Sequence, residues 1–162
     1  MDFTIENDVL LGYEGADEYV PIPEGVTAIG AYAFMNNECL KGVTIPDSVT
    51  SIGKLAFHQC SNLTSINIPE GVTSIEKMVF SKCSSLTQIT LPSTVTSIGE
   101  CAFAQCSSLV SVNIPEGVTS IGKQAFALCS SLVSVNIPEG VTSIEKQAFI
   151  WCTIMCAAAR LR

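Results

Sequence analysis

The chain has 162 residues, of which 48% are hydrophobic and 14% are charged, and its formal net charge at pH 7 is -7. This length and apolar content predict one compact folded domain and exclude a disordered chain. The acidic balance excludes binding to nucleic acid and to anionic lipid, because both require clustered Lys or Arg side chains to displace counterions.

The N-terminal segment, Met1 to Asp8, contains neither a basic region nor an apolar stretch, so it does not resemble a secretory signal. On this basis we expect the chain, as encoded, to remain in the cytoplasm. The longest apolar stretch, residues 148–159, covers about twelve residues, whereas a membrane-spanning helix needs about 20. We therefore expect no insertion into a membrane.

From residue 19 onward the sequence repeats every 23 residues, without insertion or deletion. The proline positions are Pro23, Pro46, Pro69, Pro92, Pro115 and Pro138, and the phenylalanine positions are Phe34, Phe57, Phe80, Phe103, Phe126 and Phe149. One unit reads L-x-x-I-x-I-P-x-x-V-T-x-I-G-x-x-A-F-x-x-C-x-x. A fixed period of this length is typical of a solenoid, in which each repeat forms one coil.

The elements of one unit can be predicted from its side-chain pattern. Residues 63–68 alternate apolar and polar side chains, which predicts a half-buried β-strand. Residues 69–71, Pro-Glu-Gly, predict a turn in which glycine accepts a positive φ. Residues 72–75 alternate again and predict a second short extended segment. Residues 77–83 then predict one or two helical turns that direct Phe80 inward.

A single unit cannot fold alone. Burying about seven apolar side chains gives about 10–20 kcal/mol, whereas ordering the backbone costs about 1–2 kcal/mol for each residue. Parallel stacking of equivalent strands, about 4.8 Å apart, would join the Leu, Ile, Val and Phe positions into one shared core. The sequence therefore predicts an α/β repeat fold: a right-handed solenoid with a parallel sheet on one face and turns or short helical turns on the other.

The run I-P-x-x-V-T-x-I-G-x-x-A-F-x-x-C resembles the repeat of the BspA-type leucine-rich-repeat family, and the similarity covers roughly residues 19–152. The resemblance implies a leucine-rich-repeat solenoid of six units, of which the first and last are incomplete. It implies that residues 1–18 form an N-terminal cap, with two short strands around the turn at residues 6–8. Residues 153–162 depart from the pattern and are expected to form an irregular tail.

The resemblance also has implications for function. The family includes surface proteins of bacteria and protists with roles in adhesion, so it implies a protein-interaction module at the cell surface. This location differs from the cytoplasmic one that the N-terminal segment indicates.

The sequence offers little for catalysis. Its one histidine, His58, occupies a repeat position that holds Met35 and Ser81 in neighbouring units, so we assign it no role. The glycines are spread along the repeats and form no phosphate-binding loop. We expect no enzymatic activity, no catalytic residue, no metal and no cofactor.

The chain contains eight cysteines, and none forms a C-x-x-C metal motif. Five of them occupy one repeat position: Cys60, Cys83, Cys106, Cys129 and Cys152. We expect these five to be reduced, buried thiols, because parallel side chains in a ladder lack the dihedral angle of a disulfide. Asn37 takes the same position in the first unit, where we expect it to cap backbone groups. Cys39, Cys101 and Cys156 lie outside the ladder, and we consider Cys101 and Cys156 candidates for exposure and oxidation.

Two further columns follow from the repeat. The position occupied by Gly30, Gly53, Gly99 and Gly122 holds Glu76 and Glu145 in other units, which predicts ordinary backbone angles there. An acidic column in the turn is made of Glu24, Glu70, Glu116 and Glu139, with Asp47 and Ser93 at the intervening positions. We interpret it as a solvated edge, with weak cation binding as the alternative.

The outward positions of the first strand in each unit form the candidate binding face. They are Gly42, Thr44, Ser65, Asn67, Gln88, Thr90, Ser111, Asn113, Ser134 and Asn136. This set is polar and uncharged, and it lacks the Tyr, Trp and Arg side chains that anchor many interfaces. We predict a non-catalytic interaction module that binds a protein or a glycan weakly or multivalently.

Alternatives remain open at this stage. One alternative is that the candidate binding face is solvated and has no ligand. The chain would then be a structural repeat fragment or spacer that self-associates through its C-terminal end. A second flat row, the Thr column that includes Thr50 and Thr96, is a form of surface that can bind ice, although the β-propensity of Thr alone accounts for it.

Overall fold

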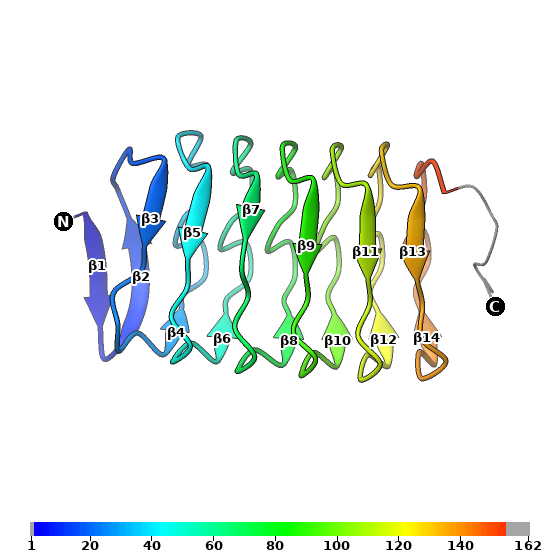
Figure 1. Ribbon diagram of the computed structural model, residues 1–162, viewed down its shortest axis with the longest axis horizontal. Helices are drawn as coiled ribbons and strands as arrows, with labels where there is room; N and C mark the ends of the chain where they lie inside the picture. The colour runs from blue at the N-terminus through cyan, green and yellow to red at the C-terminus, as the bar shows by residue number, and fades with distance from the viewer. Residues whose placement is uncertain (1, 155–162) are drawn as a thin grey trace.

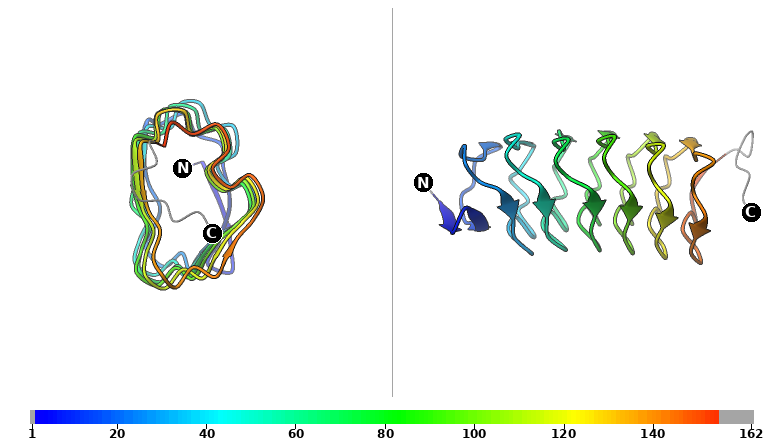
Figure 2. Two further views of the ribbon diagram at one scale, coloured as in Figure 1. Left: turned by 90° about the vertical axis from the view of Figure 1, so that its right-hand side faces the viewer. Right: turned by 90° about the horizontal axis from the view of Figure 1, so that it is seen from below.

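The computed structural model describes residues 2–154, which form a solenoid of parallel strands (Figure 1). Viewed along the long axis, successive coils superpose with one outline (Figure 2). The predictions of a solenoid and of parallel stacking are confirmed. Residues 155–162, which include most of the expected irregular tail and Cys156, lie outside the described residues. The boundaries of the cap, the repeat array and the tail stay predictions.

Each coil contributes one strand to each of two parallel ladders. The first ladder contains β3 (Tyr19–Pro21), β5 (Gly42–Thr44), β7 (Ser65–Ile66), β9 (Gln88–Thr90), β11 (Ser111–Asn113) and β13 (Ser134–Asn136). The second ladder contains β2 (Val9–Tyr13), β4 (Ala28–Ile29), β6 (Ser51–Ile52), β8 (Ser74–Ile75), β10 (Ser97–Ile98), β12 (Ser120–Ile121) and β14 (Ser143–Ile144). From β4 onward, the strands of the second ladder are the short extended segments that the sequence predicts after each proline turn.

Both ladders are interrupted between the same two turns of the chain, namely the turn that runs from β6 to β7 and the turn that runs from β8 to β9. Within the described residues β6 and β8 are not paired, and only a bridge between Asn67 and Thr90 joins the β7 coil to β9. On the opposite side of the same two coils the hydrogen bonds continue, because the Leu55 N–H donates to the Lys77 carbonyl at 3.0 Å. The coils are therefore joined there by their turns more than by their strands.

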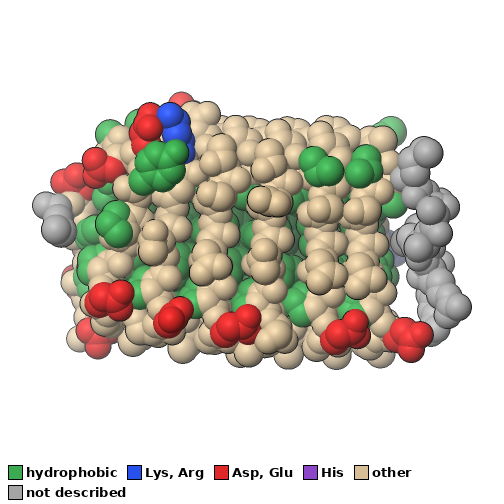
Figure 3. All heavy atoms as spheres, in the orientation of Figure 1, with side chains coloured by type: hydrophobic (Ala, Val, Ile, Leu, Met, Phe, Trp, Pro, Cys, Tyr) green, Lys and Arg blue, Asp and Glu red, His purple; other side chains and the backbone are tan. Residues whose placement is uncertain are grey.

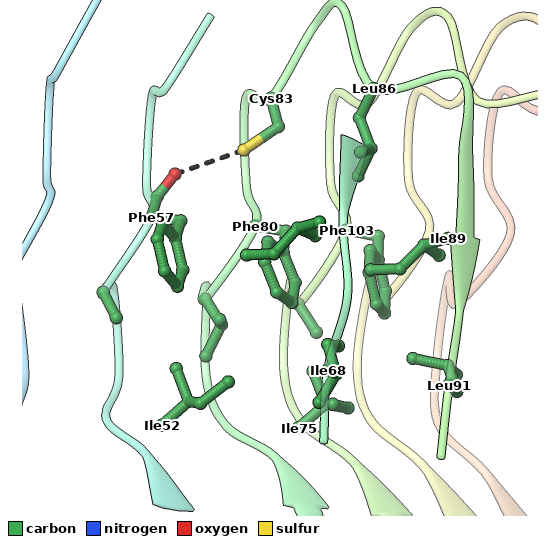
Figure 4. Packing of buried hydrophobic residues seen from close by; sticks show 14 of the residues in the cluster. Ile52, Phe57, Ile68, Ile75, Phe80, Cys83, Leu86, Ile89, Leu91 and Phe103 are labelled. Carbon is green, nitrogen blue, oxygen red and sulfur yellow. Dashed lines mark hydrogen bonds between the residues drawn. The ribbon is translucent and has the colours of Figure 1, made fainter. Parts of the chain in front are cut away.

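The core is a set of columns in which equivalent side chains lie above one another (Figure 4). The phenylalanine column is a continuous stack: the rings of Phe57 and Phe80 have centroids 5.6 Å apart and planes 7° apart, and those of Phe126 and Phe149 are 5.2 Å and 2° apart. Phe80 is fully buried. Because each ring from Phe34 to Phe126 contacts an aromatic ring on both sides, every coil completes the core of its neighbours, as the repeat predicts.

The N-terminal end is covered by a strand pair, which confirms the expectation for that segment. β1 (Phe3–Glu6) pairs antiparallel with β2, and Asn7 and Asp8 between them have φ of 50° and 62°. Positive φ at both central residues is the geometry of a two-residue hairpin turn. The pair extends the aromatic stack, because the Phe3 and Tyr13 ring centroids are 4.9 Å apart and Tyr13 lies 5.4 Å from Phe34.

The predicted helical turns are wrong: the residues that the structure describes form no helix. Each of these segments is a run of turns with two residues of positive φ, such as Leu55 at 58° and Gln59 at 60°. Successive N–H groups alternate between two kinds of acceptor. The Phe57 N–H donates to Val79 in the next coil at 3.0 Å, whereas the His58 N–H donates to the local Leu55 carbonyl at 3.1 Å. Bonds between coils replace those that would close a helix.

The glycine predictions divide in two. Ordinary angles at the Gly30, Gly53, Gly99 and Gly122 positions are confirmed, since Gly25, with φ of 89°, is the only described glycine with a positive φ. The same finding overturns the expected positive φ at Gly71. A Cβ atom there would lie 2.9 Å from the Val49 carbonyl oxygen, so the close approach of the preceding coil favours glycine at this turn.

Candidate binding face

The outward side chains of the first ladder form one continuous polar surface (Figure 3). Strand pairing is in register, so equivalent residues are neighbours: Ser111 pairs with Ser134, and Asn113 with Asn136. The structure places nine predicted residues on this surface, and all of them are exposed: Thr44, Ser65, Asn67, Gln88, Thr90, Ser111, Asn113, Ser134 and Asn136. We call these nine residues the polar face.

Two rows of side chains run along the polar face. One row consists of short hydroxyl groups and Gln88, and the other consists of amides and Thr hydroxyls. The Asn136 side-chain amide donates to the Asn113 side-chain oxygen at 3.2 Å, which fixes the orientation of both groups. Each amide retains further donor or acceptor capacity. The arrangement presents regularly spaced hydrogen-bonding groups and no charge.

Charged residues lie at the borders of the polar face. Acidic side chains form a broken row along its lower edge in Figure 3. The break corresponds to Ser93, whose backbone N–H and hydroxyl both donate to the Glu70 carboxylate, at 3.0 and 2.8 Å. At the other border the Lys41 ammonium lies 2.7 Å from the Glu18 carboxylate, and this hydrogen bond raises the pKa of Lys41. Both residues of that pair are exposed, so it contributes little to stability.

One predicted position is not available to a ligand. Gly42 is buried, because the ring of Tyr19 in the preceding coil lies over it. A Cβ atom on Gly42 would lie 3.0 Å from Cδ1 of that ring. Tyr19 itself is 68% exposed. An aromatic side chain therefore stands at the N-terminal end of a surface that the sequence predicted to have none.

The predicted set of outward residues begins at Gly42, one coil after Tyr19, and therefore omits Tyr19. Tyr19 precedes Gly42 by one repeat and has the same strand position, and this register could have identified it. The set also omitted Val110 and Val133, which are each 47% exposed and lie directly before β11 and β13. They replace Thr64 and Thr87 of earlier coils, so the substitution of a polar residue by an apolar one was the available signal.

The cysteine column belongs to the core and not to a reactive site. The Cys106 thiol donates to the Phe80 carbonyl at 3.1 Å, and the other cysteines of the column make the same contact one coil apart. Burial raises the pKa of both Cys60 and Cys106 to about 12, so these thiols are protonated at neutral pH. Cys60, Cys83, Cys106 and Cys129 are free and buried, as the sequence predicted, whereas Cys152 in the last coil is free but only half-buried.

Asn37, which takes the cysteine position in the first unit, does cap backbone groups, as predicted. Its side-chain amide donates to the Gly15 carbonyl at 3.2 Å, and its side-chain oxygen accepts from the N–H groups of Cys39 and Leu40 at 3.1 and 3.2 Å. Of the cysteines outside the column, Cys39 is exposed and Cys101 is half-buried. Burial raises the pKa of Cys101, which does not favour a reactive thiolate.

His58 lies on the turn side of the solenoid, away from the polar face. Burial, followed by the charge of Lys82, lowers its pKa, so the imidazole is neutral at pH 7. Among residues 2–154 no group of three His, Cys, Asp or Glu side chains is arranged to hold a metal ion. Within the same range there is no helix that could cross a membrane.

The two parallel ladders and the stacked columns define a leucine-rich-repeat solenoid. The sequence matches six copies of the BspA type Leucine rich repeat region over residues 18–156. The chain therefore belongs to the BspA-type leucine-rich-repeat family. Folds of this class are generally non-enzymatic, and their members generally mediate protein interactions. No curated protein matches the chain.

Solved bacterial structures share this fold. A leucine rich cell surface protein from Faecalibacterium prausnitzii is 36% identical, with a TM-score of 0.85 over 94% of this chain and 45% of that one. A leucine-rich repeat protein from Bacteroides ovatus is 37% identical, with a TM-score of 0.75 over 88% of this chain and 40% of that one. The T. pallidum Leucine Rich Repeat protein is 30% identical, with a TM-score of 0.79 over 90% of this chain and 78% of that one. The chain thus spans less than half the length of the first two.

Proposed function

We propose that this protein is a non-catalytic binding module of the adhesion type, which uses the polar face to hold a protein or a glycan. The observation that carries the proposal is the in-register exposure of all nine polar residues on one side of the solenoid. Repeated hydrogen-bonding groups at the spacing of the coils suit an extended partner that makes several weak contacts at once.

The surroundings of the polar face support this function. Tyr19 at one end, with Val110 and Val133 at the other, supplies the apolar contacts that the polar residues lack. Aromatic side chains in particular contribute large contact areas at interfaces. The similar protein from Faecalibacterium prausnitzii is described as a cell surface protein, which favours a partner outside the cell for this chain as well.

Introducing charge on the polar face, with a matched control, tests this proposal. We expect the triple variant Asn67→Arg, Asn113→Arg and Asn136→Arg to lose capture of its partners from panels of extracellular-matrix proteins and of glycans, because three bulky cations would disrupt a neutral surface. The matched control places three Arg side chains at the exposed Thr73, Thr119 and Thr142, which lie directly before β8, β12 and β14. It should bind as the parent chain does. Equal binding by both variants would contradict the proposal.

A structural role is the second candidate, and one observation favours it. Apolar side chains that are buried in earlier coils are only half-buried in the last one: Val112 and Val118 are 3% and 0% exposed, whereas Val135 and Val141 are intermediate. Such a coil end can pair with another chain. Light scattering distinguishes this role, since a chain that stays monomeric at high concentration does not assemble through its C-terminal coil.

A further inference from the structure

The first ladder ends at β3, and the outer edge of this strand has no partner among the described residues. β3 pairs only with β5. The hairpin of β1 and β2 covers the second ladder instead, because β2 pairs with β4. The N-terminal cap therefore closes one of the two ladders and leaves the other with a free strand edge. A free edge carries unpaired backbone groups that can bind another strand.

The backbone groups on this free edge can be assigned from their neighbours. The Ile22 N–H donates to the Thr44 carbonyl and the Gly42 N–H donates to the Glu18 carbonyl, each at 3.0 Å. Since successive residues of a strand direct their groups to opposite edges, those of Tyr19 and Pro21 point to the free edge. Proline has no N–H and is tolerated in a strand only on such an edge.

A hollow of about 490 Å³ lies beside the free edge, between β3 and the hairpin. Its apolar lining comes from the core side of the cap and includes Phe3, Tyr13, Val20 and Ile22. Tyr13, Val20 and Ile22 are otherwise buried, so the hollow exposes a small part of the core. An added strand would direct alternate side chains into this space.

The charged side chains that line the hollow are acidic within residues 2–154. They are the carboxylates of Asp2, Asp17 and Glu24, and the described lining contains no Lys, Arg or His. Asp17 and Glu24 lie on either side of β3 in the sequence, and Asp17 also accepts a hydrogen bond from the Tyr13 hydroxyl at 2.7 Å. An occupant with an apolar centre and cationic ends would complement both the lining and the charges.

We propose that the free edge of β3 and the adjoining hollow bind an extended basic peptide segment, which adds to the first ladder as a further strand. Its backbone pairs with Tyr19 and Pro21, its apolar side chains enter the hollow, and its Lys or Arg side chains contact the carboxylates near the two ends of β3. This site lies at the end of the solenoid and does not depend on the function of the polar face.

The full chain can be titrated against a fluorescent acetyl-Lys-Ile-Thr-Ile-Lys amide, with fluorescence anisotropy as the readout. We expect binding with one peptide for each chain. Glu24→Gln should weaken it about threefold, as for a partly exposed ion pair. Glu116→Gln is the matched control, since it removes the same charge from the same repeat position four coils away and should change nothing. An equal effect of both variants would show general attraction to an acidic protein and would overturn the proposal.

Peptides methylated on backbone nitrogens test the strand pairing without changing the protein. Methylation at the two Ile nitrogens and methylation at the nitrogens of Thr and the second Lys affect opposite edges of the added strand. One of these peptides should bind about tenfold more weakly than the other, because it loses a hydrogen-bond donor and clashes with β3. Equal binding of the two, or no binding of the parent peptide, would contradict the proposal. Light scattering provides a further test. If the chain self-associates and the peptide dissolves the assembly, a second copy of the chain is the occupant of the free edge, and the proposal is contradicted.

Discussion

The thiol of Cys106 donates a hydrogen bond to the carbonyl oxygen of Phe80, in the preceding coil, at 3.1 Å. The same contact recurs along the cysteine column and joins the coils through the interior of the solenoid. The Phe80 carbonyl also accepts from the Cys83 N–H at 3.1 Å, so the thiol adds a second, inter-coil hydrogen bond to a group that the local turn already pairs.

The buried thiols predict how stability changes with pH. The pKa of Cys106 is raised by burial from 9.0 to about 12, so the unfolded chain releases this proton at lower pH than the native chain. Between these two values the unfolded state binds fewer protons, and the free energy of unfolding must fall as the pH rises. Urea unfolding at pH 8 and pH 10.5 should show lower stability at pH 10.5. In native protein at pH 8, a thiol reagent should modify the exposed Cys39 and leave the four buried thiols, Cys60, Cys83, Cys106 and Cys129, unmodified. Rapid reaction of these four thiols under those conditions would contradict the prediction.

Asn37 predicts a second stability effect. Asn37→Ala removes one donor to Gly15 and one acceptor for two backbone N–H groups. We expect a loss of about 1–3 kcal/mol in the free energy of unfolding, because partly buried backbone groups are left without partners. Asn62→Ala is the control, since the Asn62 amide makes a single bond, to the Glu38 carbonyl, at an exposed site. Equal losses in the two variants would show that the capping bonds of Asn37 have no special role.

The positive-φ turn residues give a prediction that the expected helical turns would not. Gln105 is exposed and has φ of 61°. Gln105→Gly should raise the free energy of unfolding by up to about 1 kcal/mol, whereas Gln105→Val should lower it by about 1–2 kcal/mol, because a β-branched side chain fits a left-handed backbone poorly. In the extended strand β9, Gln88→Val should have little effect. A neutral Gln105→Val would contradict the assignment of the turn.

The core columns and the exposed polar face followed from alternation, because a strand must direct successive side chains to opposite sides. Residues 77–83 were expected to form helical turns, as were their equivalents in the other coils, including the segment around Phe57. The alternative, bonds between Phe57 and the next coil, exists only once the coils are stacked. Tyr19 was missed because the repeat pattern is weakest in the first unit, where its strand position holds an aromatic residue.

The aromatic stack predicts a gradient of stability along the solenoid. Phe80→Ala should cost about 3–5 kcal/mol, because its fully buried ring contacts rings on both sides. Phe149 is only half-buried, and among the described residues its ring stacks on Phe126 alone, so Phe149→Ala should cost clearly less. Urea unfolding of the two variants measures the difference, and circular dichroism confirms that both are folded. Equal costs would mean that the stacking of neighbouring coils does not contribute to the free energy of unfolding. That result would contradict the solenoid model, in which no unit is stable without its neighbours.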